Sequence, residues 1–215
     1  MPKILKGMLF SFFFFSIHCA NQENINNRLF DAIAAKEINA VQKALKNGAD
    51  VNARTNNRVT ALMAALMYED EKTASLLIEK GADINARDND EKTALMWGLC
   101  FNNKKILLEL IRKGADVKIV NKDRISVLMF ALLFGKQEIA ALLIRKGVNL
   151  NAPDYEGKTA LMIAAMCGEK ELTFLLIKKG ADINAKNNDG KTALGYAVDK
   201  EYNEIINILK QNGAK

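Results

Sequence analysis

The chain has 215 residues, a net charge of +6 and a single histidine, His18, which lies in an apolar N-terminal stretch. If that stretch is removed as a leader, the mature chain has no histidine, which excludes Ser–His and Cys–His nucleophilic catalysis and any histidine-based metal site. The sequence also has no phosphate-binding glycine loop and no catalytic carboxylate pair, so we expect a non-enzymatic protein without cofactor or metal.

Residues 1–19 have the composition of a secretory or lipoprotein-like signal segment. Lys3 and Lys6 precede the apolar run 8–17, and no acid interrupts them. A basic start followed by a short apolar stretch is typical of a leader, and the run is shorter than the roughly 20 apolar residues of a membrane span. We therefore predict export to the periplasm, the medium or the envelope. The alternatives are an uncleaved anchor and a misplaced start codon.

The cleavage site has two interpretations, which stay open. Cys19 directly follows the apolar run and resembles the cysteine that becomes the lipidated first residue of a bacterial lipoprotein. The preceding residues, Ser16, Ile17 and His18, lack the leucine and the small residue expected in that pattern. A plain cut near Cys19 or Ala20 is the competing interpretation. Membrane association through the N-terminus is expected only in the first case.

After the leader the sequence repeats with a fixed period. Glycines recur every 33 residues, at Gly48, Gly81, Gly114, Gly147, Gly180 and Gly213. A second signature starts twelve residues after each of the first five, as TALMAA at Thr60, TALMWG at Thr93, SVLMFA at Ser126, TALMIA at Thr159 and TALGYA at Thr192. A period of this length predicts a solenoid of stacked repeats instead of one globular core.

The two signatures at this spacing resemble the ankyrin repeat, with T-A-L-M in place of the usual T-P-L-H. The resemblance covers residues 22–215 and implies an all-α solenoid of about six helix-turn-helix repeats joined by short hairpin loops, in which the terminal repeats act as caps. It also implies a protein-binding role, because partners of this family are usually held by the hairpin tips and the exposed ends of the first helices.

Each repeat is predicted to contain a capped first helix and an amphipathic second helix. Thr60 and its counterparts read as N-caps, and Asn27 can do the same in the weaker first repeat. Apolar residues at i, i+3 and i+4, such as Leu107, Leu110 and Ile111, mark the buried face of a second helix. The periodic glycines suit a left-handed residue after that helix. Trp97 is assigned to the core, with Gly98 compensating for its volume.

The candidate partner-binding residues come from the family mapping. Tyr68, Phe101 and Phe134 share one repeat position, where exposed aromatic side chains would form a recognition surface. Val120 and Ile125 join them where one repeat reads Lys118-Ile119-Val120 instead of Asn-Ala-Arg, and Tyr155 stands at the next hairpin tip. The alternative is that some of these side chains pack under the hairpins.

A ladder of cations precedes the periodic glycines, for example Arg145-Lys146 and Lys178-Lys179. The simpler interpretation is that they complement helix dipoles, at about 0.3–1 kcal/mol each; the other is an anionic partner. We expect a monomer that binds an unidentified protein and no nucleic acid, because no aromatic residues interleave with the ladder. An envelope-anchored lipoprotein acting at the membrane surface is the alternative function, and an enzyme is the third.

Overall fold

The computed structural model of the chain describes residues 25–101 and 103–215. These residues form two compact units, unit 1 ending at Ala115 and unit 2 beginning at Asp116. In the described residues the regular secondary structure is helical, and β-structure is limited to two isolated bridges, Arg54–Thr60 and Val120–Ser126. The all-α repeat fold expected from the sequence is therefore confirmed.

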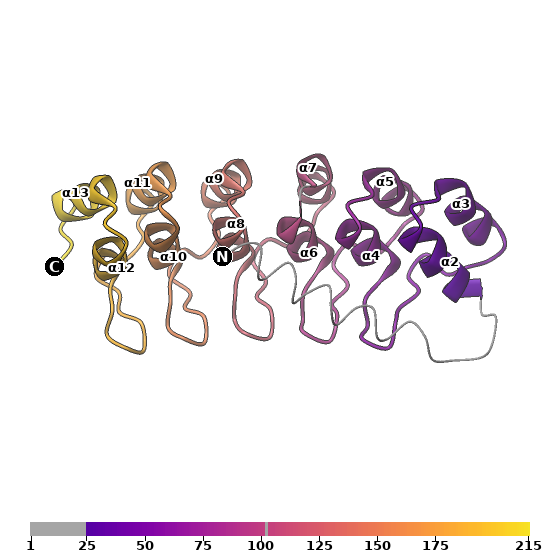
Figure 1. Cartoon of the computed structure of the whole chain (residues 1–215), viewed down its shortest axis with the longest axis horizontal. Helices are drawn as coiled ribbons and strands as arrows, with labels where there is room; N and C mark the ends of the chain where they lie inside the picture. The colour runs from indigo at the N-terminus through magenta and orange to yellow at the C-terminus, as the bar shows by residue number, and fades with distance from the viewer. Residues whose placement is uncertain (1–24, 102) are drawn as a thin grey trace. The chain divides into compact units, whose positions relative to one another are not determined.

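Unit 1 consists of three helix pairs. Within each pair a first helix packs against the second helix that follows it, and the first helices also pack against one another in a row. Figure 1 shows the second helices as a second row beside them, with the hairpins projecting from the opposite side. The helices are α2 (Ile25–Ala34), α3 (Ile38–Lys46), α4 (Ala61–Met67), α5 (Glu71–Glu79), α6 (Ala94–Cys100) and α7 (Lys104–Arg112).

Unit 2 repeats the same arrangement. Its first helices pack on one another in the order α8, α10, α12, and its second helices follow as α9, α11, α13 (Figure 1). The helices are α8 (Val127–Leu133), α9 (Gln137–Arg145), α10 (Ala160–Cys167), α11 (Lys170–Lys178), α12 (Ala193–Asp199) and α13 (Asn203–Gln211).

The first helices begin where the repeated hydroxyl residue stands. The hydroxyl oxygen accepts a hydrogen bond from the backbone N–H three residues later, at 3.2 Å for Thr60 and for Ser126, which satisfies one of the unpaired amides of the first turn. Thr159 occupies the same position without this bond, and its buried Oγ1 has no partner among the described residues. The N-cap expected at Asn27 is wrong, because Asn27 lies inside α2.

The second helices end as the glycine period predicts. The six periodic glycines all have positive φ, between 72° at Gly147 and 97° at Gly48. This is the left-handed region, where a side chain would be strained. The buried face is also as predicted, since Leu107 and Leu110 are 0% exposed.

A glycine is needed at position 98 because of Leu107, and not because of Trp97 as expected. Trp97 is a core residue, 6% exposed. However, a Cβ at position 98 would lie 2.9 Å from Leu107 Cδ2 and 3.6 Å from Leu66 Cδ2. The glycine therefore makes room for α7 to pack on α6, and does not compensate for the volume of Trp97 as the sequence analysis proposed.

The two cysteines in the described residues, Cys100 and Cys167, do not form a disulfide. No helix in residues 25–101 and 103–215 is both long enough and apolar enough to cross a membrane.

Candidate partner-binding surface

In unit 1 the two predicted binding residues differ in exposure. Tyr68 ends α4 and is half-buried, and its burial raises the pKa of the phenol. Phe101 ends α6 but is only 3% exposed, so the exposure predicted for it is wrong. The backbone explains the difference. Phe101 has extended dihedral angles (φ −120°, ψ −176°), whereas Tyr68 stays near the helical region (φ −83°, ψ 1°). The phenylalanine ring consequently leaves its helix in a different direction.

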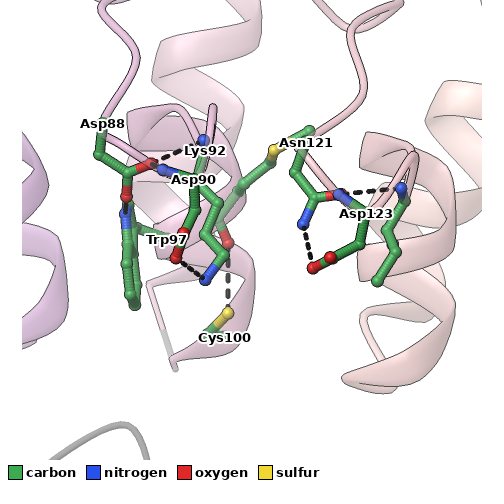
Figure 2. Close-up of polar contacts among 9 residues, drawn as sticks. Asp88, Asp90, Lys92, Trp97, Cys100, Asn121 and Asp123 are labelled. Atoms are coloured by element: carbon green, nitrogen blue, oxygen red, sulfur yellow. Dashed lines mark hydrogen bonds and ion pairs between the residues drawn. The ribbon is translucent and has the colours of Figure 1, made fainter. Parts of the chain in front are cut away.

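Trp97 is held in unit 1 by a set of polar contacts that we call the Trp97 clamp: Asp88, Lys92 and Trp97. Trp97 Nε1 donates to Asp88 Oδ2 at 2.8 Å, and Lys92 Nζ lies 4.7 Å from the centre of the indole ring (Figure 2). Asp88 Oδ1 also accepts from the backbone N–H groups of Asp90 and Lys92, both at 2.9 Å. Burial raises the pKa of the Asp88 carboxyl, although these hydrogen bonds and the Lys92 charge oppose the shift.

Unit 2 contains an equivalent set, the Tyr196 clamp, formed by Asn187, Lys191 and Tyr196. Here Asn187 Nδ2 donates to the Tyr196 hydroxyl at 3.1 Å, and Lys191 Nζ lies 4.6 Å from the ring centre. Asn187 Oδ1 accepts from the backbone N–H groups of Asp189 and Lys191. Both clamps tie a hairpin to the first helix that follows it. Sequence reasoning missed them, although a polar turn residue nine positions before an aromatic residue marks both.

The predicted hairpin residues of unit 2 form the base of a hairpin. Val120 pairs with Ser126 in an antiparallel bridge, and the Ile125 N–H donates to Asn121 Oδ1 at 2.8 Å. Asn121 also holds the turn through the Asp123 N–H, as Figure 2 shows. Val120 and Ile125 are both half-buried. They contribute apolar surface at the hairpin base, not at its tip.

In unit 2 the ends of two first helices leave apolar side chains accessible. Phe134 is half-buried and stacks on Phe130 with ring centres 6.1 Å apart, and Leu133 is 39% exposed. At the same repeat positions of α10, which packs on α8, Met166 and Cys167 are also half-buried. Leu133, Phe134, Met166 and Cys167 are called the helix-end patch below. Burial, together with the nearby Glu169 charge, raises the pKa of the Cys167 thiol, so the patch is uncharged.

Tyr155 is the most exposed large apolar side chain among the described residues, at 63%. Its backbone is fixed on both sides: the Tyr155 N–H donates to the Asp123 carbonyl at 3.3 Å, and Asn188 Nδ2 donates to the Tyr155 carbonyl at 2.9 Å. The Arg124 guanidinium lies 6.0 Å from the ring centre. A rigid, exposed tyrosine beside an arginine has the character of an interface anchor.

Cys19 lies outside the described residues. Within the described residues no cluster of three or more His, Cys, Asp or Glu side chains is arranged to hold a metal ion.

The family model for ankyrin repeats matches residues 29–121, 99–187 and 128–215, which together span nearly all of the described chain. The chain belongs to the ankyrin repeat family. Ankyrin repeat domains are generally non-enzymatic scaffolds that bind other proteins, and this class of role is supported by the match. No curated protein matches the chain.

Solved structures agree with the family. An ankyrin repeat domain from Acinetobacter baumannii AYE has 34% sequence identity and a TM-score of 0.77, and the match covers 87% of this chain and 98% of that one. A chain in the structure of a predatory endopeptidase from Bdellovibrio bacteriovorus in complex with an immunity protein has 28% identity and a TM-score of 0.76, with coverages of 86% and 97%. The ankyrin repeat domain of Bcl-3, of the IkappaB family, has 25% identity and a TM-score of 0.70, with coverages of 87% and 86%.

Proposed function

We propose that this ankyrin repeat protein is an exported, non-enzymatic scaffold that binds a protein partner through the helix-end patch of unit 2. The observation that carries the proposal is the half-exposed Phe134, stacked on Phe130 and flanked by the 39% exposed Leu133. Aromatic side chains in such a position are typical binding hot spots. One of the similar solved structures contains a protein complex, which supports a protein partner for this chain as well.

The hairpin tip at Tyr155 extends the proposed surface. Because its backbone is held by hydrogen bonds from both sides, little conformational freedom is lost when a partner binds. Val120 and Ile125 are proposed to line the same surface at the hairpin base. Tyr68 is the corresponding candidate in unit 1. Phe101 is no longer proposed as a contact residue, since it is buried.

Photocrosslinking in cells tests the proposal with a matched control inside unit 2. The photoreactive residue p-benzoylphenylalanine is introduced in place of Phe134 in one variant and of Phe174 in the other. Phe174 is 51% exposed but lies on α11, in the row of second helices. We expect a crosslinked protein at position 134 that is absent at position 174. Crosslinks to a partner only from position 174 would contradict the proposal.

Export is tested separately by sequencing the N-terminus of the protein recovered from each cell fraction. We expect a chain that begins at Cys19 or within a few residues of it. An intact Met1 or Pro2 in a soluble cytoplasmic pool would exclude export.

The second candidate function is an envelope-anchored lipoprotein, favoured by the position of Cys19 directly after the apolar run. Metabolic labelling with a radioactive fatty acid distinguishes the two. A lipoprotein incorporates label that is lost in Cys19→Ser, whereas a plainly cleaved protein incorporates none and appears in a soluble periplasmic or secreted pool.

A further inference from the structure

The C-terminal ends of the second helices carry an unusual density of unpaired cations. In unit 2, α9 ends with Arg145 and is followed by Lys146, α11 ends with Lys178 and is followed by Lys179, and Lys210 lies in the last turn of α13. All five side chains are exposed, and none forms an ion pair with any other residue in the described parts of the chain. Asp182 is the one acid within four positions of any of them along the chain.

Complementing the helix dipole does not require this arrangement, because one cation per helix end is enough. In unit 1, α5 provides the comparison, because it ends with Glu79 and its one cation is the following Lys80. A second helix can therefore end with a single cation, whereas α7 of the same unit carries the pair Arg112 and Lys113. The paired cations of α9 and α11 therefore need a further explanation.

An exposed apolar side chain accompanies the cation pair on two helices. Phe174, 51% exposed, lies one turn before Lys178 on α11. In unit 1, Leu108 is 42% exposed and lies one turn before Arg112, which Lys113 follows. Residues four apart share a helix face. Each unit thus presents a bulky apolar group beside two cations, and the two examples occupy the same repeat position.

We propose that the second-helix surface of unit 2, formed by the cation pairs of α9 and α11 with Phe174, binds the headgroup region of an anionic phospholipid bilayer, and that Arg112 and Lys113 with Leu108 form a site of the same kind in unit 1. Cations attract the lipid phosphates, and neighbouring phenylalanine or leucine side chains enter the boundary of the acyl chains. A nucleic acid backbone would satisfy the cations but would leave these apolar side chains in water. This surface lies on the second helices, whereas the helix-end patch lies at the ends of the first helices. Lipid binding and partner binding can therefore be tested independently of each other.

Vesicle co-sedimentation of the full chain tests the proposal. The probes are vesicles of phosphatidylcholine with about 30 mol% phosphatidylglycerol, and vesicles of phosphatidylcholine alone, at about 0.1 M salt. We expect binding to the anionic vesicles that exceeds binding to the neutral ones. The apolar N-terminal stretch with Lys3 and Lys6 is common to all variants, so the difference in binding between each variant and the unchanged chain does not depend on it.

Lys178→Gln together with Lys179→Gln should weaken binding to the anionic vesicles by about 25-fold, at roughly fivefold for each lysine. The matched control is Lys118→Gln with Lys122→Gln, which removes the same charge from an exposed hairpin of unit 2 and should change binding less than about twofold. Phe174→Ser should also weaken binding to the anionic vesicles. Because this loss comes from apolar contact and not from charge, its size should not depend on the salt concentration. Circular dichroism confirms that each variant is folded.

Three results would overturn the proposal: no preference for anionic vesicles, equal losses in the control and in the Lys178/Lys179 variant, or tighter binding to a single-stranded oligonucleotide than to the vesicles. Equal losses would mean that only net charge matters. Tighter oligonucleotide binding would assign the cations to a nucleic acid.

Discussion

The Trp97 clamp of unit 1 and the Tyr196 clamp of unit 2 have the same geometry with opposite hydrogen-bond direction. In unit 1 a carboxylate accepts from the indole N–H at 2.8 Å, and in unit 2 an amide N–H donates to the phenol oxygen at 3.1 Å. An indole can only donate, whereas a phenol can donate or accept. The turn residue therefore has to match the ring nine positions later, and only the unit 1 clamp requires a second acceptor oxygen on that residue.

The two units also differ at the residue that ends a first helix. Phe101 of unit 1 is buried, while Phe134 of unit 2, at the same repeat position, is half-exposed. The comparison indicates that the same repeat position contributes to the core after α6 and stays partly accessible after α8.

The largest expected effect concerns these two phenylalanines. Phe101→Ala should reduce the free energy of unfolding by about 3–5 kcal/mol, as for a fully buried ring. Phe134→Ala should cost about 1–2 kcal/mol, because only part of the ring leaves water on folding. Urea denaturation followed by circular dichroism measures both. Equal losses would show that the two units do not differ in this way.

Exchanging the turn residues of the clamps should have an asymmetric effect. Asp88→Asn places an amide where the Trp97 N–H and two backbone N–H groups all require acceptors, so one buried donor stays unpaired at a cost of about 1–3 kcal/mol. Asn187→Asp should change stability by less than about 1 kcal/mol, because the Tyr196 hydroxyl can donate to the new carboxylate. The same denaturation assay applies, and a larger loss for Asn187→Asp would reverse the interpretation of the clamps.

A smaller, spectroscopic effect should separate the charged clamp from the neutral one. Trp97 is the single tryptophan, so its fluorescence reports on Asp88. Because burial raises the pKa of Asp88, the emission should titrate with a midpoint above the ordinary aspartate value of 3.8.

The raised pKa of Asp88 also makes the free energy of unfolding depend on pH. Between pH 3.8 and the raised pKa the folded chain keeps a proton that the unfolded chain has lost, so this group's contribution to stability falls as the pH rises through that window. The fluorescence titration should disappear in Asp88→Asn and persist in Asn187→Asp. A midpoint at or below 3.8 would mean that the hydrogen bonds outweigh the burial.

The last prediction is that a reducing agent has no effect on the melting temperature. Among the described residues each unit has one cysteine, the buried Cys100 and the half-buried Cys167, and the two form no disulfide. The melting temperature of the monomer should therefore be the same with and without a reducing agent. A decrease of several degrees on reduction would show that the two thiols form a disulfide in solution.

Much of the fold follows from local rules that repeat. The hydroxyl N-caps and the positive-φ glycines depend on the backbone within a few residues, so the period of 33 residues predicts them correctly in nearly every copy. Prediction failed where local rules do not decide. Asn27 lies in a helix that begins earlier than expected, and the space at Gly98 is taken by Leu107 of another helix.

The candidate surface was predicted less completely, for a physical reason. A repeat position determines where a Cα lies, but the exposure of a side chain depends on the backbone angles at that residue and on every neighbour. Phe101 and Phe134 share a repeat position but differ in their backbone angles and in their neighbours. Leu108 and Phe174 were not selected at all, because a single apolar residue on an amphipathic second helix has no distinguishing pattern in the sequence.

The sequence by itself determined the period, the repeat family, the start of most first helices, the end of the second helices and the ladder of cations, because each of these depends on the type and spacing of residues that are close together in the chain. Only the tertiary structure decided which aromatic rings are buried, that Asp88 and Asn187 each bind the ring nine positions later, and that Phe174 and Leu108 stand exposed beside the cations. Those outcomes depend on contacts between side chains from different turns and helices, and the repeat period alone does not specify them.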